Sequence, residues 1–390
     1  MARGNPIHNA AKPAGSPTRA DGPRPFNLHL FVTASMLTAA ALPMASDPQH
    51  KEDVLNLVEG MTAEMMDGLK AYKASTHAAN RQAHDVLWTQ GSTRLLHMSE
   101  GAAKTSAPVL LVPSLVNRAD ILDLDAQHSF AAYLSEAGFD VYMIDWGAPG
   151  EGEKTFTIDD YITQRLYPVL DQLDRPHVIG YCMGGTMAAG GIAALADQSN
   201  VRSLTLLAAP WDFAAGDKMM AMRMNAFALS AGPVMDTTKR LPVDWIQALF
   251  ASVDPLFAFN KFRSFAKMDP DSPAARRFVI VEDWLNDGVD LTAPAANQAL
   301  QQWYIENQPV NGVWTIGKTL VDASNIKVPT YVVAAGADRL VPSPSALAIA
   351  GQIVASQTLT PDIGHIGMMA SPRAIAAVWQ PIAAFLKQAS

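Results

Sequence analysis

The chain of 390 residues contains a single cysteine, Cys182. No disulfide can therefore form within the chain, and this scarcity of cysteine is typical of a reducing compartment. We accordingly expect a cytoplasmic protein. The same scarcity leaves Cys182 as the only thiol that could act as a nucleophile.

The sequence also lacks the charge and ligand patterns of several function classes. Its net charge is −8 and no basic stretch is long enough to resemble a nucleic-acid footprint, so we expect no nucleic-acid partner. It contains no metal-ligand cluster, no phosphate-binding P-loop and no dinucleotide fingerprint, so we predict no metal and no cofactor. Apolar residues make up 49% of the chain, which is enough for a substantial core.

No long uninterrupted apolar run is present. Residues 26–45 are moderately apolar, but polar residues interrupt them and Pro43 ends them, which is a weak signal for a membrane span. A signal peptide is an alternative, although the leader would be long and its few basic residues are spread out. We expect instead a helix that lies on the globular body. Residues 1–25 are rich in Pro, Gly, Ala and Arg, which predicts disorder.

What the sequence does contain is a sharp turn around its one cysteine. The apolar pair Val178-Ile179 leads into Gly180-Tyr181-Cys182-Met183-Gly184-Gly185, and a run of small residues follows. This is the pattern of a nucleophile elbow with cysteine in place of serine. Glycines two residues on either side of the nucleophile would avoid collisions at a strained turn. The start of the following helix favours a thiolate, whereas a lone cysteine elsewhere is usually a small buried apolar residue.

Apolar strands alternate with helices from about residue 108 onward. This rhythm predicts an α/β fold, with a doubly wound and mostly parallel sheet that helices cover on both faces. The predicted strands cover residues 87–98 (as a hairpin), 108–112, 140–146, the run after Pro176, 201–209 and 330–335, and the predicted helices cover 47–75, 123–137, 158–173 and 371–388.

One long segment interrupts this rhythm. Residues 211–327 are too long for a loop and, with five tryptophans and many methionines and phenylalanines, too apolar for a linker. We predict a mostly helical lid inserted into the sheet domain, although additional core is the simpler alternative. The predicted divisions are a variable N-terminal segment (1–46), a helical segment (47–80), the first part of the sheet domain (81–210), the lid (211–327) and the second part of the sheet domain (328–390).

A thiol nucleophile needs a base and a group that orients the base. Where an elbow ends a strand of such a sheet, the chain order is nucleophile, acid, histidine. His365 is the only histidine after Cys182, and it lies in a glycine-flanked loop before the last helix. Asp338 follows the strand over residues 330–335, where the acid is expected. We therefore predict a Cys182, Asp338 and His365 triad, with Asp362 as a weaker alternative for the acid.

An acyl-transfer site also needs backbone donors for an oxyanion. One should be the amide of the residue after the nucleophile, Met183. The second should come from the loop at residues 113–118, after the first parallel strand, and Val116 is our candidate.

The motifs that place these residues also carry a resemblance to a known family. They are Val116-Asn117-Arg118, Ile121-Leu122-Asp123-Leu124, Ile144-Asp145-Trp146-Gly147, the cysteine turn, Pro210-Trp211-Asp212-Phe213, Asp338 with Leu340-Val341-Pro342, and Gly364-His365-Ile366-Gly367. From about Leu87 onward the sequence resembles the polyhydroxyalkanoate synthases, which are relatives of the α/β-hydrolases. The Ile-Asp-Trp-Gly and Gly-His-Ile-Gly segments look most like the short synthases of the two-subunit type.

The resemblance implies an α/β-hydrolase fold and an enzyme that polymerises 3-hydroxyacyl-CoA, with Cys182 as the acyl carrier and Asp338 and His365 as its partners. It further implies a growing polyester chain, a granule surface, a possible second synthase subunit and a homodimer. The sequence departs from the family pattern at Arg339, where histidine usually follows the acid, and at Ala119-Asp120 before Ile-Leu-Asp-Leu.

The residues are compatible with three functions. The first is acyl transfer, in which the thiolate attacks a thioester and a 3-hydroxyl group then takes the acyl chain. The second is a cysteine hydrolase on the same scaffold, either an acyl-CoA thioesterase or a polyester depolymerase. The third is a pseudo-enzyme that associates with granules or stabilises a partner, and the complete triad argues against it.

Overall fold

The computed structural model of the chain describes residues 22–25, 27, 29, 34–35, 48–99, 107–216 and 219–389. Most of the segment predicted to be disordered, and most of the helix predicted over residues 26–45, lie outside these residues. No helix in the described part of the chain is both long and apolar enough to cross a membrane.

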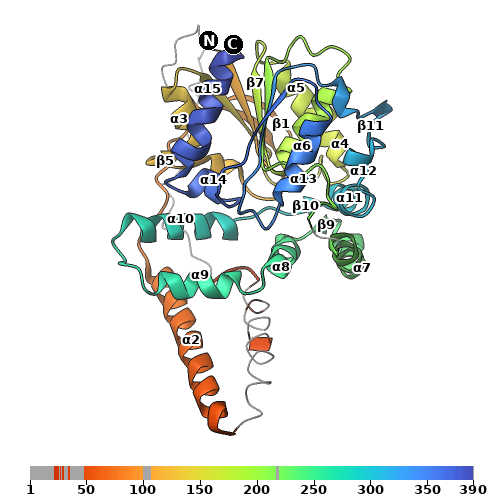
Figure 1. Cartoon of the computed structure of the whole chain (residues 1–390). Helices are drawn as coiled ribbons and strands as arrows, with labels where there is room; N and C mark the ends of the chain where they lie inside the picture. The colour runs from red at the N-terminus through yellow and green to blue at the C-terminus, as the bar shows by residue number, and fades with distance from the viewer. Residues whose placement is uncertain are drawn as a thin grey trace, which may run out of the picture.

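A central sheet of eight strands has the order β1-β2-β6-β3-β7-β8-β13-β14 (Figure 1). The predicted hairpin is β1 and β2, β2 is antiparallel to β6, and every later neighbouring pair is parallel. The prediction of a mostly parallel sheet is confirmed. The strands are β1 (Asp85–Gln90), β2 (Thr93–His97), β3 (Pro108–Val112), β6 (Asp140–Asp145), β7 (His177–Tyr181), β8 (Ser203–Leu207), β13 (Thr330–Val333) and β14 (Ser356–Leu359).

Helices cover both faces of this sheet, as the apolar strands predicted. In β7, Val178 belongs to the apolar cluster on one face and Ile179 to the cluster on the other. Both side chains are buried, which explains why this strand is apolar at successive positions. The helices on one face are α3 (Phe130–Glu136), α14 (Gly367–Ala370) and α15 (Gln380–Gln388), and those on the other are α4 (Ile158–Tyr161), α5 (Tyr167–Leu170), α6 (Met183–Ala194) and α13 (Ser343–Leu347) (Figure 1).

The helix predicted over residues 123–137 is wrong in its first half. Residues 123–129 form a small antiparallel pair, β4 (Asp123–Asp125) and β5 (His128–Ser129), and α3 begins only at Phe130. The carboxylate of Asp125 accepts the backbone amides of Asn80 and Gln127, which holds the chain in a turn. The hydroxyl of Ser129 accepts the amide of Ala132 and caps the helix there.

The inserted residues 211–327 separate into two groups of helices. The first group lies beyond the carboxyl ends of the strands and is here called the roof; its helices are α7 (Met220–Thr238), α8 (Val243–Val253), α9 (Phe257–Phe265) and α10 (Pro273–Asn286) (Figure 1). The second group, α11 (Ala293–Gln298), a π-helical segment (Ala299–Ile305) and α12 (Gln308–Asn311), packs beside the sheet domain. There a Cβ on Gly190 of α6 would lie 2.1 Å from the ring of Trp314, so only glycine allows this contact.

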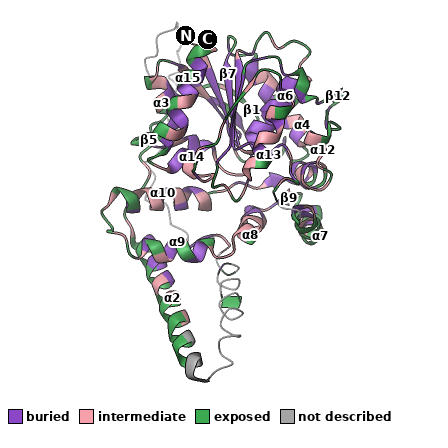
Figure 2. Cartoon of the chain, in the orientation of Figure 1, coloured by how far each residue is buried: buried purple, intermediate pink, exposed green. Residues whose placement is uncertain are grey.

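The predicted helix over residues 47–75 is α2 (Pro48–Ala74), which projects from the body of the molecule (Figures 1 and 2). Its C-terminal half packs on α9, where Met65 and Tyr72 are buried with Phe262. Its other half is exposed, and Leu55 and Leu57 face solvent. These two leucines give the projecting half of α2 an apolar element on an otherwise mostly polar surface.

Candidate active site

Cys182 lies at the tip of the turn between β7 and α6, as predicted for an elbow nucleophile. Its backbone has φ 54° and ψ −129°, a conformation that is strained for a residue with a side chain. A Cβ on Gly180 would lie 2.4 Å from the Cα of Gly185, and a Cβ on Gly184 would lie 2.2 Å from the backbone oxygen of Pro113. The glycines therefore have the steric role that the sequence predicted for them.

The structure brings His365 and Asp338 together from two separate loops. The Nδ1 atom of His365 lies 2.6 Å from Oδ2 of Asp338. The other carboxylate oxygen of Asp338 accepts the backbone amides of Leu340 and Val341 at 2.8 and 2.9 Å. The Asp338 side chain is fully buried, so these bonds fix its orientation. Asp338, and not the alternative Asp362, is the carboxylate that contacts the histidine.

His365 lies in an environment that favours its charged form. Burial by itself lowers its pKa, but the charges of Cys182 and Asp338, and hydrogen bonds to both, outweigh this effect and raise the pKa to about 10. An imidazolium between a thiolate and a carboxylate explains that direction. The ring of His365 also lies against the ring of Tyr181, with 5.2 Å between their centroids. The site can therefore hold a positively charged proton donor beside Cys182 at neutral pH.

The two predicted oxyanion donors lie in the walls of the same cavity. Met183 is the first residue of α6, where backbone amides have no partner within the helix. The amide of Val116 donates to the hydroxyl of Ser114 at 3.1 Å, in a local turn. The indole of Trp146 donates to the backbone oxygen of Pro113 at 2.9 Å and fixes the start of that loop.

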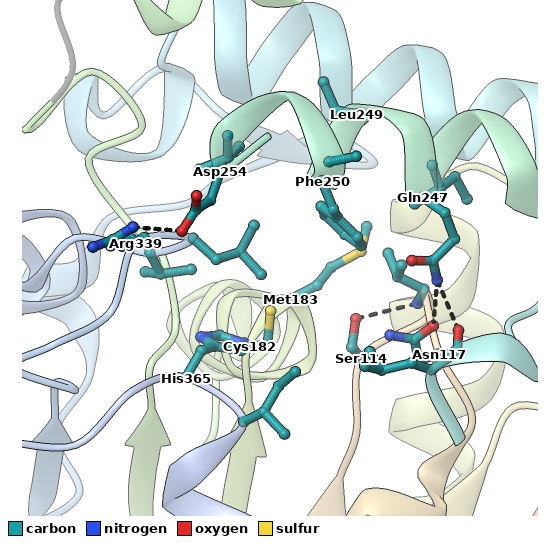
Figure 3. A pocket seen from close by; sticks show the side chains of 18 of the residues that line it. Ser114, Asn117, Cys182, Met183, Gln247, Leu249, Phe250, Asp254, Arg339 and His365 are labelled. Carbon is teal, nitrogen blue, oxygen red and sulfur yellow. Dashed lines mark hydrogen bonds and ion pairs between the residues drawn. The ribbon is translucent and has the colours of Figure 1, made fainter. Parts of the chain in front are cut away.

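The cavity above Cys182 has a volume of about 650 Å³. Its floor consists of four loops at the carboxyl ends of the strands, residues 113–118, 181–183, 337–341 and 364–367, and its roof consists of α8 and α9 with parts of α7 and α10 (Figure 3). Most of the wall contributed by the roof is apolar, and includes Phe227, Ile246, Leu249, Phe250, Phe257 and Trp284. In the described part of the chain, no three His, Cys, Asp or Glu side chains gather in a way that could hold a metal ion.

Several contacts at the cavity were not predicted from the sequence. Tyr304, in the π-helical segment, lines the cavity, and burial together with the charge of Cys182 raises the pKa of its hydroxyl. Arg24, from the segment predicted to be disordered, donates to Asp244 of α8 at 2.9 Å. An ion pair joins Arg339 to Asp254 at the end of α8. None of these contacts follows a local pattern, although a π-helical segment is often found at a functional site.

Comparison with known proteins shows which family the chain belongs to. Residues 107–372 match the family of the alpha/beta hydrolase fold. The chain is 30% identical over 324 residues to the poly(3-hydroxyalkanoate) polymerase subunit PhaC of Haloarcula marismortui, covering 78% of this chain and 68% of that protein. The proteins of the same name from Synechocystis and Allochromatium vinosum are 30% and 28% identical, over 68% and 74% of this chain and 73% and 83% of theirs.

Proposed function

Because this chain belongs to the poly(3-hydroxyalkanoate) polymerases of the alpha/beta hydrolase fold, we propose that it transfers 3-hydroxyacyl groups from CoA thioesters to a growing polyester through Cys182, His365 and Asp338. The observation that carries this assignment is the contact of His365 with both Asp338 and the elbow cysteine. Cysteine suits the reaction because exchange between thioesters is nearly balanced in free energy and a thiolate is a good leaving group.

In the proposed first step, the thiolate of Cys182 attacks the thioester carbonyl and forms a carbon–sulfur bond. The oxygen of the tetrahedral intermediate accepts the amide of Met183 and, as its second donor, the amide of Val116, which exchanges its bond to the Ser114 hydroxyl for the oxyanion. The intermediate then breaks its bond to the sulfur of CoA, which leaves with the proton of the His365 imidazolium. The acyl group remains on Cys182, and His365 is neutral.

In the second step, the 3-hydroxyl of another 3-hydroxyacyl-CoA attacks the acyl-enzyme. Neutral His365 takes the hydroxyl proton as an ester bond forms, and the thiolate of Cys182 leaves. The extended acyl-CoA then repeats the first step, so each cycle adds one unit and releases one CoA. Asp338 is buried and bonded to His365 and two amides, which supports an orienting role rather than direct deprotonation of the hydroxyl.

The apolar roof supports transfer over hydrolysis. Water that entered the cavity would compete with the 3-hydroxyl for the acyl-enzyme, and a mostly apolar wall disfavours its entry. We further propose that the protein needs no cofactor beyond its thioester substrate, acts in the cytoplasm as a homodimer or with a second subunit, and associates with the granule surface. The exposed Leu55 and Leu57 of α2 support such an association.

One assay separates this proposal from a cysteine hydrolase. Purified protein receives 3-hydroxybutyryl-CoA with a labelled acyl group, and released CoA, free acid and oligomer are measured together. We expect CoA release with labelled oligomer as the main product. A single-turnover experiment then follows label loss from Cys182 with and without added monomer. Rapid release of free acid in both cases, with no oligomer, would overturn the polymerase assignment in favour of a thioesterase or depolymerase.

A further inference from the structure

Two helices of the roof contact the loop that contains Val116. The indole nitrogen of Trp284, on α10, donates to the backbone oxygen of Arg118 at 2.9 Å. The side-chain nitrogen of Gln247, on α8, donates to Oδ1 of Asn117 at 3.4 Å (Figure 3). Asn117 and Arg118 directly follow Val116, so the roof holds the two residues next to the proposed oxyanion donor.

Both donors are buried at the contact between roof and floor. Trp284 is 5% exposed and Gln247 is 9% exposed. Gln247 also donates to the backbone oxygen of Leu285 at 3.1 Å, which joins α8 to α10. A buried polar group without a partner destabilises a protein, so these bonds favour the arrangement in which the roof lies on the loop.

The opposite end of α8 contacts the loop of the triad acid. Asp254 ends the helix and forms an ion pair with Arg339, the residue after that acid. Arg339 is 75% exposed at its side chain, so this pair stabilises the contact less than the buried bonds do. In Figure 3 the two contacts of α8 lie on either side of Cys182, and Phe250 lies between them.

We propose that Trp284 and Gln247 are positioning residues that hold Asn117 and Arg118 in place, and that seating of the roof thereby positions the oxyanion loop, whose Val116 amide is the proposed second oxyanion donor. This inference rests on the proposed function. The contacts among Cys182, His365 and Asp338 involve floor residues alone, so they do not depend on the bonds of Trp284 and Gln247. The Asp254 contact adds a weaker restraint at the acid loop.

Because these roof contacts involve the oxyanion loop and not the triad, two reactions of Cys182 should respond differently to their loss. Acylation of Cys182 by a thioester develops an oxyanion and therefore needs the Val116 amide in place. Alkylation of Cys182 by iodoacetamide develops no oxyanion at a carbonyl, and it needs the thiolate alone. A loosened oxyanion loop should therefore slow acylation and leave alkylation unchanged. General damage to the site would change both.

The test uses Trp284→Phe and Gln247→Leu in the full chain, singly and together. Phenylalanine keeps an aromatic ring and leucine keeps an apolar side chain of similar size, while each removes the N–H donor. Trp245→Phe is the matched control, because Trp245 lies on α8, packs against Phe227 and is not part of the cavity wall. Acylation by labelled 3-hydroxybutyryl-CoA is measured in a single turnover, and alkylation is measured on the same samples.

We expect each single variant to slow acylation by about fivefold to tenfold, the change that loss of one hydrogen bond corresponds to. Alkylation should stay within twofold, and the control should match the original protein in both assays. Acylation within twofold of the original protein in the double variant would overturn the inference. So would equal slowing of acylation and alkylation.

A second experiment tests the weaker contact. Asp254→Asn and Arg339→Gln should each slow acylation by about twofold to threefold, as expected for an exposed ion pair. Since both changes break one contact, the double variant should be no slower than the slower single variant. Additive losses would remove this contact from the inference. If the original protein forms no acyl-enzyme at all, the proposed function itself has failed, and that result is distinct from every outcome above.

Discussion

The floor of the cavity and the outer surface of the roof differ in how far their side chains are buried. On the floor, Asp338 is fully buried and accepts three hydrogen bonds, and His365 lies between it and Cys182. On the roof, two apolar side chains of α7 face solvent: Leu229 is 81% exposed and Met222 is 57% exposed. The comparison indicates that the floor fixes the reacting atoms through buried polar contacts, whereas the roof covers them with mostly apolar side chains, some of which also face solvent.

The pKa values of two buried histidines show how strongly the floor affects His365. His177 is buried in β7, on the strand that leads to the elbow, and burial together with the charge of Arg202 lowers its pKa to about 4. Burial acts in the same direction on His365, yet its pKa is raised to about 10 because Cys182 and Asp338 lie beside it. Neighbouring charges, not burial, therefore decide which histidine is positively charged at neutral pH.

The largest effect on activity should come from removing the thiol of Cys182. Cys182→Ala should abolish CoA release from 3-hydroxybutyryl-CoA, because no other thiol exists in the chain. The fold should persist, since the alanine side chain needs no more space than cysteine. Activity is checked by CoA release and the fold by thermal unfolding. Any substantial activity in this variant would eliminate the covalent mechanism.

Removal of the base, His365, should have the second-largest effect. His365→Ala should lower the acylation rate by about 10³-fold, because the leaving CoA loses its proton donor and the thiolate loses its counter-ion. Single-turnover acylation measures this loss. A decrease of less than tenfold would mean that another group acts as the base. Leu229→Ser, on the exposed part of the roof, is the control and should leave the rate within twofold.

Asp338→Asn should have a smaller effect than loss of the base. An amide in place of the carboxylate removes the charge that orients and stabilises the imidazolium, and we expect a decrease of about 10²-fold. Because Asp338 bonds to His365 and two amides, the loss should be equal in acylation and in chain extension. Measuring both steps tests this. A larger loss in chain extension would instead indicate that the acid helps to deprotonate the incoming hydroxyl.

Two glycines allow the stability of α6, which packs against the floor loop at residues 113–118, to be compared with that of the roof. Gly184→Ala should destabilise the fold by about 3 kcal/mol, since the new Cβ would lie 2.2 to 2.4 Å from backbone oxygens of Pro113 and Val112. Gly232→Ala, within α7, has nothing within 4 Å of its Cβ and should change stability by 1 kcal/mol or less. Chemical denaturation of both variants checks the difference. Equal effects would show that the floor is not more tightly packed.

The smallest expected effect concerns the pKa values of two histidines. Histidine NMR should show His365 titrating near pH 10 and His177 near pH 4. Since the pKa of His365 exceeds the ordinary 6.5, its contribution to stability is fully present below pH 6.5 and is lost as the pH rises through about 10. Cys182→Ala should lower the pKa of His365 and leave that of His177 unchanged. Unaltered titration of His365 would argue against a thiolate beside it.

How much the sequence could predict depends on whether a contact follows a local pattern. The elbow, its glycines and the order of Cys182, Asp338 and His365 follow from spacing along the chain, and the structure brings these residues together. The contacts of Gln247 and Trp284 with the oxyanion loop join segments more than 100 residues apart, and no periodicity marks them. The helix predicted over residues 123–137 was wrong in its first half for a related reason: hydrogen bonds to the carboxylate of Asp125 outweighed the apolar pattern.

The volume of the cavity has a consequence for the length of the product. If the polyester grows on Cys182 as proposed, it soon exceeds the cavity volume of about 650 Å³, so its older end must pass out of the cavity while its newest unit remains attached. The exit must therefore admit a moving strand yet still keep water from the thioester. The opening between roof and floor, as well as the chemistry at the cysteine, would then influence how long one chain continues to grow.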